Sequence, residues 1–403
     1  MLERVSSAEG GAAQAGAAGD CVARARALAP LIAAHAARIE RERAVTPEVL
    51  AALHEAQLFR MLMPRSCGGL EVDPLTYVQT LEEIAKADGS TAWCIGQGSG
   101  CTVSAAYVAP EVAREIFGDA RAVMASGPSG TNTKAVVVPG GYRASGSWSF
   151  ASGIKHAGWL ACHCALFEPD GTPRLEPDGK PAERTLLFPK SSARVTDIWR
   201  VVGLKGTGSD NYTIEDLFVP AEYSYTRESP DDRRERGPLY RITIYHLYGM
   251  GFAAIALGLA RATLDAFVEL AATKIPNSRT AVLRDNAVVQ SQVALAEAKL
   301  QSARAYLLQS LREMWETATR GDIPSIAQRA TLKLAGTYAA HQAKDVVDTV
   351  YHAAGATAIF ESNPFERRFR DMHTVMQQVQ AQFVNFEMVG QVLLGLPSQT
   401  RLI

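Results

Sequence analysis

The chain has 403 residues, of which 47% are hydrophobic and 21% charged, and its formal net charge is -1. This composition is ordinary for a globular protein with one large or two to three smaller domains, and the balanced charge argues against a nucleic acid or an anionic membrane as the partner. Six cysteines scattered over this length do not form a disulfide framework, so we expect a reducing, cytoplasmic compartment.

The first 118 residues are predicted to form a tail followed by a helical domain. Residues 1–20 are rich in Ala and Gly and lack the apolar core of a signal peptide, so we expect a disordered tail there. From 21 to 118, apolar residues recur three and four positions apart, and Thr46, Pro47 and Glu48 mark a helix start. This segment is therefore expected to be an N-terminal α-helical domain.

The segment 119–225 has the composition of a small antiparallel β domain. β-branched and aromatic residues alternate along it with Gly and Ser, and Gly-Gly and Asp-Gly pairs supply turns. Cys162, His163 and Cys164 lie in one of the predicted strands. Because side chains alternate along a strand, His163 faces away from its neighbours, and no metal site is expected.

The segment 226–403 is predicted to contain a four-helix bundle, because long Ala-rich helical patterns are interrupted only by short breaks such as that at Pro276. The most apolar stretch, GMGFAAIALGLARATLDAF, contains Arg261 and Asp265. We expect it to be too short and too polar to span a bilayer, and to pack inside the bundle. The charged stretch 223–240 is expected to be a solvated loop or a lid.

Four separated segments carry a resemblance to a known family. They read FRMLMPRSCGGLEVDPLTYVQTLEEIAKADGSTAWCIG, GGYRASGSWSFASGIKHAGW, VVGLKGTGSDNYTIEDLFVP and YHAAGATAIFESNPFERRFRDMHT. In this order they resemble the flavoproteins of the acyl-CoA dehydrogenase fold. The resemblance implies an α+β architecture with an N-terminal α-helical domain, a middle antiparallel β-barrel-like domain and a C-terminal four-helix bundle.

Within this superfamily, the segments WSFASG and NPFERRFRD most resemble those of the two-component (group D) monooxygenases. This branch contains the hydroxyphenylacetate, secosteroid-phenol and dibenzothiophene oxygenases. The resemblance implies that reduced FMN arrives from a separate flavin reductase and reacts with O2 to give a flavin C4a-hydroperoxide. The terminal oxygen would then pass to a small organic substrate, and the protein would shield the reactive species from water. It also implies a homo-oligomer, most often a tetramer, and FAD stays open as the flavin.

The position of the dehydrogenase base separates the two activities of the fold. Acyl-CoA dehydrogenation needs a carboxylate base, and in most members of the fold a glutamate follows the Arg-Asp pair by eight residues, which here is Val379. Histidines that assist phenol hydroxylation in the resembling branch correspond to Cys101 and Gln378. A glutamine orients a substrate but cannot remove a proton, so we expect a substrate with its own nucleophilic nitrogen, sulfur or electron-rich carbon.

Several residues are candidates for catalysis. Ser152, in FASG, is expected to hydrogen-bond the flavin N5, the alternative being a serine that merely ends a strand. Trp93 either walls the flavin ring or is a core aromatic residue. His156 lies four residues beyond Ser152, so on an extended strand it would share that face, unless it is a satisfied core histidine.

The resemblance assigns further residues to the cofactor and to the substrate pocket. The flavin-binding set is Trp93, Ser126, Gly127, Ser152, Thr207, Arg279 and Arg370, and the pocket set is Cys101, His246, Tyr248 and Gln378. Arg279 resembles the arginine that reaches the flavin phosphate of a neighbouring subunit, but the following residues depart from the usual phosphate segment, which favours FMN over FAD. Arg370 and Asp371 are expected to form a structural ion pair at a helix start, or to touch the flavin.

The segment 366–395 is predicted to be one amphipathic helix. Its buried stripe would contain Met372, Val375, Met376, Val379 and Phe383. Two other functions stay open at this point. One is an FAD-dependent acyl-CoA dehydrogenase or oxidase with a displaced base such as Glu387, and the other is a non-catalytic binding protein that kept the fold.

Overall fold

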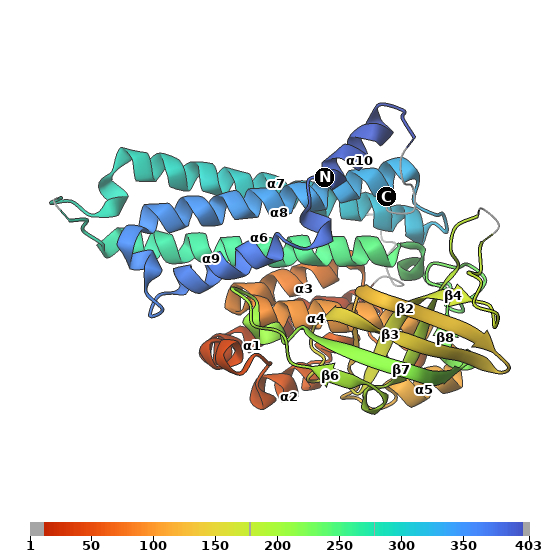
Figure 1. Cartoon of the computed structure of the whole chain (residues 1–403). Helices are drawn as coiled ribbons and strands as arrows, with labels where there is room; N and C mark the ends of the chain where they lie inside the picture. The colour runs from red at the N-terminus through yellow and green to blue at the C-terminus, as the bar shows by residue number, and fades with distance from the viewer. Residues whose placement is uncertain (1–11, 177–178, 278, 398–403) are drawn as a thin grey trace.

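The computed structural model describes residues 12–176, 179–277 and 279–397, and its elements follow the expected order of helices, strands and helices (Figure 1). The helical domain consists of α1 (Ala12–Glu42), α2 (Pro47–Glu55), α3 (Pro74–Ala87), α4 (Gly89–Thr102) and α5 (Pro110–Phe117). Aspartates begin both central helices, since Asp73 accepts from the N–H of Thr76 at 2.9 Å and Asp88 from that of Thr91 at 2.7 Å. α3 and α4 are largely buried.

Helix α1 extends into the segment that was expected to be disordered. The prediction of a tail over residues 1–20 is wrong from Ala12 onward, where the helix begins, and residues 1–11 lie outside the described part of the chain. The Ala-rich composition accounts for the difference, because alanine has the highest intrinsic helix propensity.

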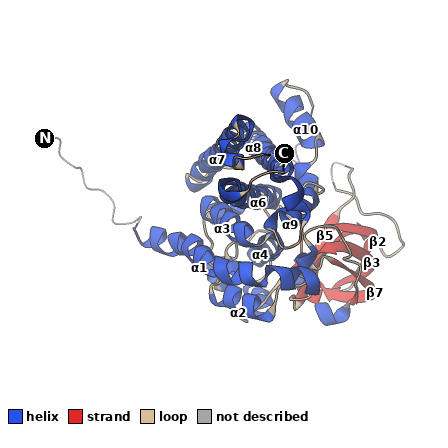
Figure 2. Cartoon of the chain, turned by 90° about the vertical axis from the view of Figure 1, so that its left-hand side faces the viewer, coloured by secondary structure: helices blue, strands red, loops and turns tan. Residues whose placement is uncertain are grey.

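The middle domain is one eight-stranded sheet with the strand order β6-β7-β3-β2-β4-β5-β8 and with β1 paired to β4. Its strands are β1 (Met124–Ser126), β2 (Ser129–Val138), β3 (Gly141–Ala151), β4 (Trp159–Phe167), β5 (Glu183–Pro189), β6 (Arg194–Thr196), β7 (Asp210–Pro220) and β8 (Ser224–Tyr225). Most pairs are antiparallel as expected, but β4 pairs in parallel with β1 and with β2. The sheet lies beside the helices, and α4 contacts it through β1 (Figure 2).

The alternation predicted for Cys162, His163 and Cys164 holds along β4. The two cysteines are buried with their Sγ atoms 3.6 Å apart, and the Nδ1 atom of His163 lies 2.9 Å from the Oγ1 atom of Thr185. Among the described residues, no cluster of three His, Cys, Asp or Glu side chains has the arrangement of a metal site.

The C-terminal domain contains α6 (Ile244–Thr273), α7 (Ala287–Thr319), α8 (Ile326–Ala354), α9 (Pro364–Val375) and α10 (Val384–Leu393). α6 is its central helix and contacts α3, α4, α7, α8 and α9. The expectation that this stretch is too short and too polar to span a membrane is wrong, since α6 is long and apolar enough by both criteria. However, 72% of its most apolar window is buried inside the protein, so α6 is a core helix of the bundle.

The predicted helix 366–395 is broken in the structure. α9 ends at Val375, the short 3-10 helix η10 (Val379–Ala381) follows, and α10 leaves the bundle at an angle (Figures 1 and 2). The side chain of Gln378 accepts from the N–H of Gln380 at 2.6 Å and begins η10 instead of continuing the helix. Val379 and Phe383 are consequently 62% and 74% exposed, so their prediction as buried residues is wrong.

Candidate functional site

Four side chains form a chain of hydrogen bonds where the helical domain meets the sheet. The indole Nε1 of Trp93, on α4, donates to the hydroxyl of Ser152, in the turn after β3, at 3.0 Å. The hydroxyls of Ser152 and Ser209 lie 2.7 Å apart, and those of Ser209 and Thr207 also lie 2.7 Å apart. Thr207 ends the 3-10 helix η5 (Lys205–Thr207) and donates to the carbonyl of Leu204 at 2.8 Å.

The direction of this hydroxyl chain follows from counting protons. A carbonyl only accepts, so the single hydroxyl proton of Thr207 goes to Leu204. Ser209 must therefore donate to Thr207, and Ser152 must donate to Ser209. The Ser152 oxygen accepts from Trp93 and keeps one lone pair, so it is arranged to accept a hydrogen bond from a bound group and not to donate one.

Aromatic rings of α6 continue the site next to Trp93. Phe252 stacks on Trp93 with 4.3 Å between ring centroids, and Tyr248 stacks on Phe252 at 6.1 Å. The Tyr248 hydroxyl lies 3.8 Å from the Sγ atom of Cys101. Burial raises the pKa of Cys101 to about 11 and that of Tyr248 well above its ordinary range. Both groups therefore stay protonated and neutral at physiological pH.

The end of β1 has one feature that fits a bound flavin and one that is explained by packing. The hydroxyl of Ser126 is buried and has no hydrogen-bond partner among the described residues, and buried polar groups are normally satisfied. A Cβ atom at the next residue, Gly127, would lie 2.7 Å from the Cβ of Trp148 and 2.8 Å from the carbonyl oxygen of Ser149. Packing against β3 therefore requires glycine at position 127. Together with the acceptor position on Ser152, the unsatisfied hydroxyl of Ser126 offers a polar partner to a bound ring with N–H and C=O groups.

His156 does not belong to this cluster. β3 ends at Ala151 and Ser152 to His156 form turns, so the expectation that both residues share one face of a strand is wrong. The Nε2 atom of His156 accepts from the N–H of Val45 at 3.1 Å, and burial lowers its pKa to about 4. His156 is thus a neutral structural residue that fixes the connection between α1 and α2.

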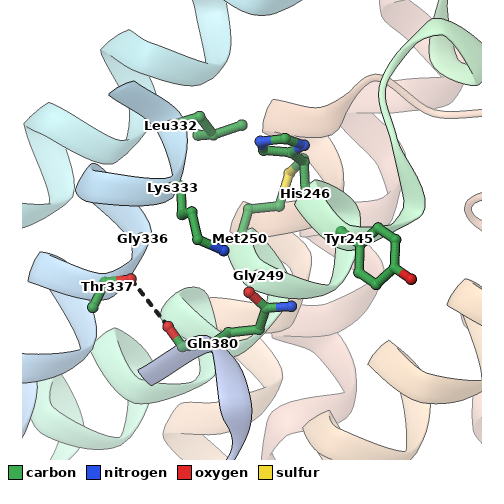
Figure 3. Close-up of a pocket in the computed structure, with 9 residues that line it drawn as sticks. All are labelled: Tyr245, His246, Gly249, Met250, Leu332, Lys333, Gly336, Thr337 and Gln380. Carbon is green, nitrogen blue, oxygen red and sulfur yellow. Dashed lines mark hydrogen bonds between the residues drawn. The ribbon is translucent and has the colours of Figure 1, made fainter. Parts of the chain in front are cut away.

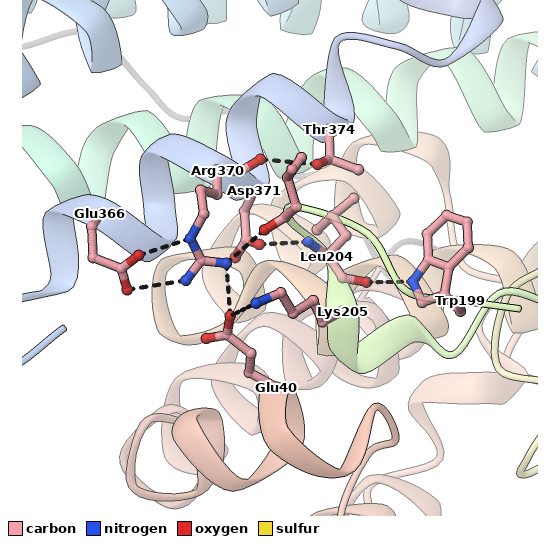
Figure 4. Close-up of polar contacts among 9 residues, drawn as sticks. Glu40, Trp199, Leu204, Lys205, Glu366, Arg370, Asp371 and Thr374 are labelled. Carbon is pink, nitrogen blue, oxygen red and sulfur yellow. Dashed lines mark hydrogen bonds and ion pairs between the residues drawn. The ribbon is translucent and has the colours of Figure 1, made fainter. Parts of the chain in front are cut away.

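Arg370 and Asp371 lie inside α9 and have separate partners, so the predicted ion pair between them is wrong (Figure 4). Arg370 donates to Glu366 at 2.7 and 3.0 Å, and to Glu40 and the carbonyl of Val202 at 2.7 Å each. These contacts join α9 to α1 and to the loop before η5. Arg370 therefore stabilises the junction between the C-terminal domain, the N-terminal helical domain and this loop.

Asp371 connects α9 to the hydroxyl chain through the backbone of Leu204. Its Oδ1 atom accepts from the N–H of Leu204 at 2.6 Å. The carbonyl of Leu204 accepts from Thr207, and from the indole of Trp199 at 3.0 Å. Burial raises the pKa of Asp371 to about 7, and the charge of Asp88 contributes to the increase.

A cavity of ≈ 20 Å³ lies between α6 and α8 and is bordered by Gln380 of η10 (Figure 3). Its lining from α6 consists of Tyr245, His246, Gly249 and Met250, and the rest of the wall consists of Leu332, Lys333, Gly336, Thr337 and Gln380. The hydroxyl of Thr337 donates to the carbonyl of Gln380 at 3.0 Å and anchors η10 on α8. Of the residues predicted for the substrate pocket, the cavity contains only His246.

His246 has no ring nitrogen free for proton transfer. Its Nε2 atom lies 3.1 Å from the carbonyl of Arg329 and must donate, so Nδ1 accepts from the hydroxyl of Thr243 at 2.6 Å. Burial, together with the charges of Lys333 and Arg329, lowers the pKa of His246 to about 4. The ring is therefore neutral and contributes shape and polarity to the wall.

Three other candidates lie away from both clusters. Gln378 begins η10, and Gln380, two residues later, lines the cavity. Arg279 is exposed in the loop between α6 and α7, at the end of the bundle remote from the sheet (Figure 1). Glu387, the candidate displaced base, is exposed on α10 and accepts from Gln391 at 3.3 Å.

Sequence reasoning missed Ser209, Phe252, Lys333 and Gln380. Ser209 lies in the segment VVGLKGTGSDNYTIEDLFVP, and a hydroxyl two residues after Thr207 was the available signal. Lys333 and Gln380 meet only through the packing of α8 against η10, for which the sequence contains no local pattern.

Comparison with known proteins covers nearly the whole chain. The family models "Acyl-CoA dehydrogenase, N-terminal domain" and "Acyl-CoA dehydrogenase, C-terminal domain" match residues 23–116 and 250–383. Indole-3-acetate monooxygenase of Pseudomonas putida is 29% identical over 88% of this chain and 89% of that protein. The oxygenase subunit HsaA of a flavin-dependent monooxygenase from Rhodococcus jostii is 27% identical over 86% of this chain and 91% of that protein.

A solved structure shows the same similarity at the level of the fold. XiaF from Streptomyces sp., in complex with FADH2 and glycerol, superposes with a TM-score of 0.88 at 25% identity, covering 97% of this chain and 99% of that chain. The two sequence relatives and this structure thus share the architecture over all three segments of the chain.

Proposed function

The chain belongs to the acyl-CoA dehydrogenase family, and from this premise we propose that it is the oxygenase component of a two-component flavin-dependent monooxygenase. One observation carries the proposal. The position of the usual dehydrogenase base is Val379, which is 62% exposed on η10, while Ser152 offers an acceptor in a buried cluster of hydroxyl and aromatic groups. A valine cannot remove an α-proton.

A reduced flavin supplied by a separate reductase would provide the electrons that activate O2, with one oxygen atom entering the substrate and the other leaving as water. The residues of this chain position that flavin and keep water away. Ser152 would accept from its N–H, Ser126 would lie beside it, and Trp93 with Phe252 would close the site on the side of α6.

The site contains few groups that could act as a base. Cys101 and Tyr248 keep their protons, and both nitrogens of His246 are engaged. The hydroxyl proton of Ser152 is committed to Ser209. We therefore propose a substrate that already has a nucleophilic atom, such as an electron-rich ring carbon, a nitrogen or a sulfur.

We propose FMN as the flavin that is used. The segment SRTAVL, which contains Arg279, departs from the phosphate-binding pattern that supports the adenine side of FAD in the fold. Anaerobic titration with reduced FMN and reduced FAD tests this choice. Tighter binding of reduced FMN supports it, and tighter binding of reduced FAD contradicts it.

We also propose that the protein assembles with copies of itself. Apolar side chains of the C-terminal segment are exposed in the single chain, among them Phe383 and Leu393 at 74% each and Leu394 at 75%. Exposed apolar surface of this kind is typical of an interface. A second copy would also bring an Arg279 loop toward a site that its own chain cannot reach.

Isotope labelling tests the proposed reaction. The protein is combined with a flavin reductase, NADH, FMN and a panel of substrates sorted by nucleophilic atom, under ¹⁸O2. Incorporation of one labelled oxygen into a product, dependent on both proteins, supports the function. Bleaching of bound flavin by an acyl-CoA, without labelled product, contradicts it.

A further inference from the structure

Three consecutive residues before η5 lie directly on α9. Arg370 donates to the carbonyl of Val202 at 2.7 Å, and Asp371 accepts from the N–H of Leu204 at 2.6 Å (Figure 4). Between these two contacts, a Cβ atom at Gly203 would lie 2.1 Å from the carbonyl oxygen of Arg370. The backbone of the loop therefore touches α9 with no room for a side chain, and the position of α9 sets the position of Leu204.

Leu204 has a backbone conformation that a leucine rarely adopts. Its φ and ψ angles are 49° and 34°, in the left-handed region, where the Cβ atom crowds the backbone. Such a conformation persists only where the surrounding structure fixes it. The carbonyl of Leu204 accepts from Trp199 at 3.0 Å and from the hydroxyl of Thr207 at 2.8 Å. Asp371 holds the other side of this strained residue, its N–H.

The carbonyl of Leu204 determines the direction of the whole hydroxyl chain. It takes the proton of Thr207, so Ser209 donates to Thr207 and accepts from Ser152, whose oxygen is left as an acceptor. If this carbonyl turned away, the proton of Thr207 would be free to point to Ser209, and that of Ser209 to Ser152. Ser152 would then have its own proton available and would donate it to a bound group.

The direction of the chain matters for a flavin because its two redox states offer different groups at N5. The reduced ring has an N–H at this position and needs an acceptor, whereas the oxidised ring has only a lone pair there and needs a donor. A polar group that leaves water and meets the wrong partner loses its hydrogen bond. Ser152 as an acceptor therefore favours the reduced ring, and Ser152 as a donor would favour the oxidised ring.

We propose that Asp371 is a positioning residue that keeps Ser152 an acceptor and thereby favours the binding of reduced over oxidised flavin. It acts through the backbone of Leu204 and the hydroxyl chain. The inference rests on the proposed function for the identity of the group that Ser152 meets. In that function, the preference lets the site take up the flavin that the reductase supplies and release the oxidised flavin that remains after turnover.

Titration of the flavin-free protein with oxidised FMN, and anaerobically with reduced FMN, measures the preference as the ratio of the two Kd values. The wild-type protein should bind reduced FMN more tightly. Asp371→Ala should decrease this preference about three- to tenfold, as expected for one neutral hydrogen bond. Asp371→Asn keeps an oxygen for the N–H of Leu204, so its ratio should stay within about twofold of the wild type. A residue that served stability alone would weaken both complexes by the same factor.

Two further variants separate this role from a general effect. Asp73→Ala is the matched control, because it also removes an aspartate that accepts from a backbone N–H, that of Thr76 at the start of α3. It should leave the ratio unchanged. In the Ser152→Ala background, Asp371→Ala should no longer change the ratio, because the group through which it acts is gone.

A measurement without flavin reports on the carbonyl of Leu204 itself. The indole N–H of Trp199 donates to this carbonyl, and that of Trp148 donates to the carbonyl of His163 at 3.1 Å inside the sheet. In NMR spectra of the flavin-free protein, Asp371→Ala should speed hydrogen exchange of the Trp199 indole about tenfold or more relative to the Trp148 indole. A general loss of stability would speed both alike.

The inference is overturned if folded Asp371→Ala keeps the wild-type ratio or the wild-type exchange of the Trp199 indole, or if its effect on the ratio persists without Ser152. If Asp371→Ala does not fold, Thr207→Val decides, because it breaks the chain at the same end with a side chain of the same shape. An unchanged ratio in that variant also contradicts the inference.

Failure of the proposed function gives a different result. A wild-type protein that binds neither flavin contradicts both the proposed function and this preference. A protein that oxygenates its substrate, with a ratio of Kd values that does not depend on Asp371, contradicts the inference alone.

Discussion

The carboxylate of Asp371 accepts a hydrogen bond from the backbone N–H of Leu204 at 2.6 Å. Leu204 in turn accepts from Thr207 through its carbonyl, and Thr207 leads through Ser209 to Ser152. A buried acid on α9 is thus three hydrogen-bonded residues away from the group that is arranged to meet the flavin. The contact fixes α9 of the C-terminal domain relative to the loop that leads into η5 and β7.

Asp371 should make the stability of the protein depend on pH. Burial raises its folded pKa to about 7, whereas an unfolded aspartate titrates at about 3.9. Between these values the folded state binds more protons than the unfolded state, so this group makes the free energy of unfolding fall as pH rises, by at most about 1.4 kcal/mol per pH unit. Above about pH 7 the contribution is constant.

Asp371→Asn should reduce that slope, since asparagine keeps an oxygen for Leu204 but does not titrate. The measurement is urea unfolding of both proteins from pH 4.5 to 8. Burial also raises the pKa of Asp88, so some slope should persist in the variant. Equal slopes in the two proteins would show that Asp371 does not titrate in this range.

Ser152 should control the lifetime of the oxygen-reactive state. Ser152→Ala leaves the buried indole N–H of Trp93 without its acceptor, which should cost about 1–3 kcal/mol of unfolding free energy. It should also shorten, by about tenfold or more, the transient absorbance seen when reduced flavin on the enzyme meets O2. Ser209→Ala breaks the hydroxyl chain one step further away and retains the acceptor for Trp93, so its effect on the lifetime should be smaller. A larger effect of Ser209→Ala would contradict this order.

Gln380, and not Gln378, should affect substrate binding. Gln380→Ala opens one wall of the cavity and should raise the KM for the substrate about tenfold, with a smaller change in kcat. Gln378→Ala removes only the side chain that begins η10, so the KM should stay within about twofold of wild type, because the lost cap is worth about 1 kcal/mol or less. Steady-state kinetics with a saturating reductase distinguishes the two. A larger effect of Gln378→Ala on the KM would contradict this prediction and support Gln378 as the residue that contacts the substrate.

The exposed apolar residues of α10 should support self-association. Replacing Leu393 and Leu394 by Asp places two charges in the proposed interface, and light scattering after gel filtration should then show a smaller particle than the wild type. Leu175→Asp, at another exposed apolar residue in the sheet domain, is the control and should keep the wild-type mass. A wild-type protein that is monomeric in solution would contradict this prediction.

The sequence predicted the architecture and part of the junction site because both depend on local patterns. Helical periodicity predicted a helix at Trp93, and the family resemblance of FASG and of VVGLKGTGSDNYTIEDLFVP indicated Ser152 and Thr207. His156 was misplaced because the strand ends at Ala151, before the alternation could reach it.

The cavity between α6 and α8, and the position of η10 beside it, depend on tertiary packing. α9 ends at Val375 and Gln378 caps η10, so the residues that follow leave the face that a continuous helix would have given them. The cavity is lined by Gly249 and Gly336, which are far apart in the sequence and meet only where α6 packs against α8. No pattern within either helix predicts that meeting.

Stopped-flow mixing tests the central claim most directly. The protein is loaded with reduced FMN under anaerobic conditions and mixed with oxygenated buffer, and flavin absorbance is followed against the same amount of free reduced FMN. An oxygenase component should form a transient absorbing species that persists longer than in free solution and disappears faster when substrate is present. Reoxidation without a transient, at the rate of free flavin, would contradict the account.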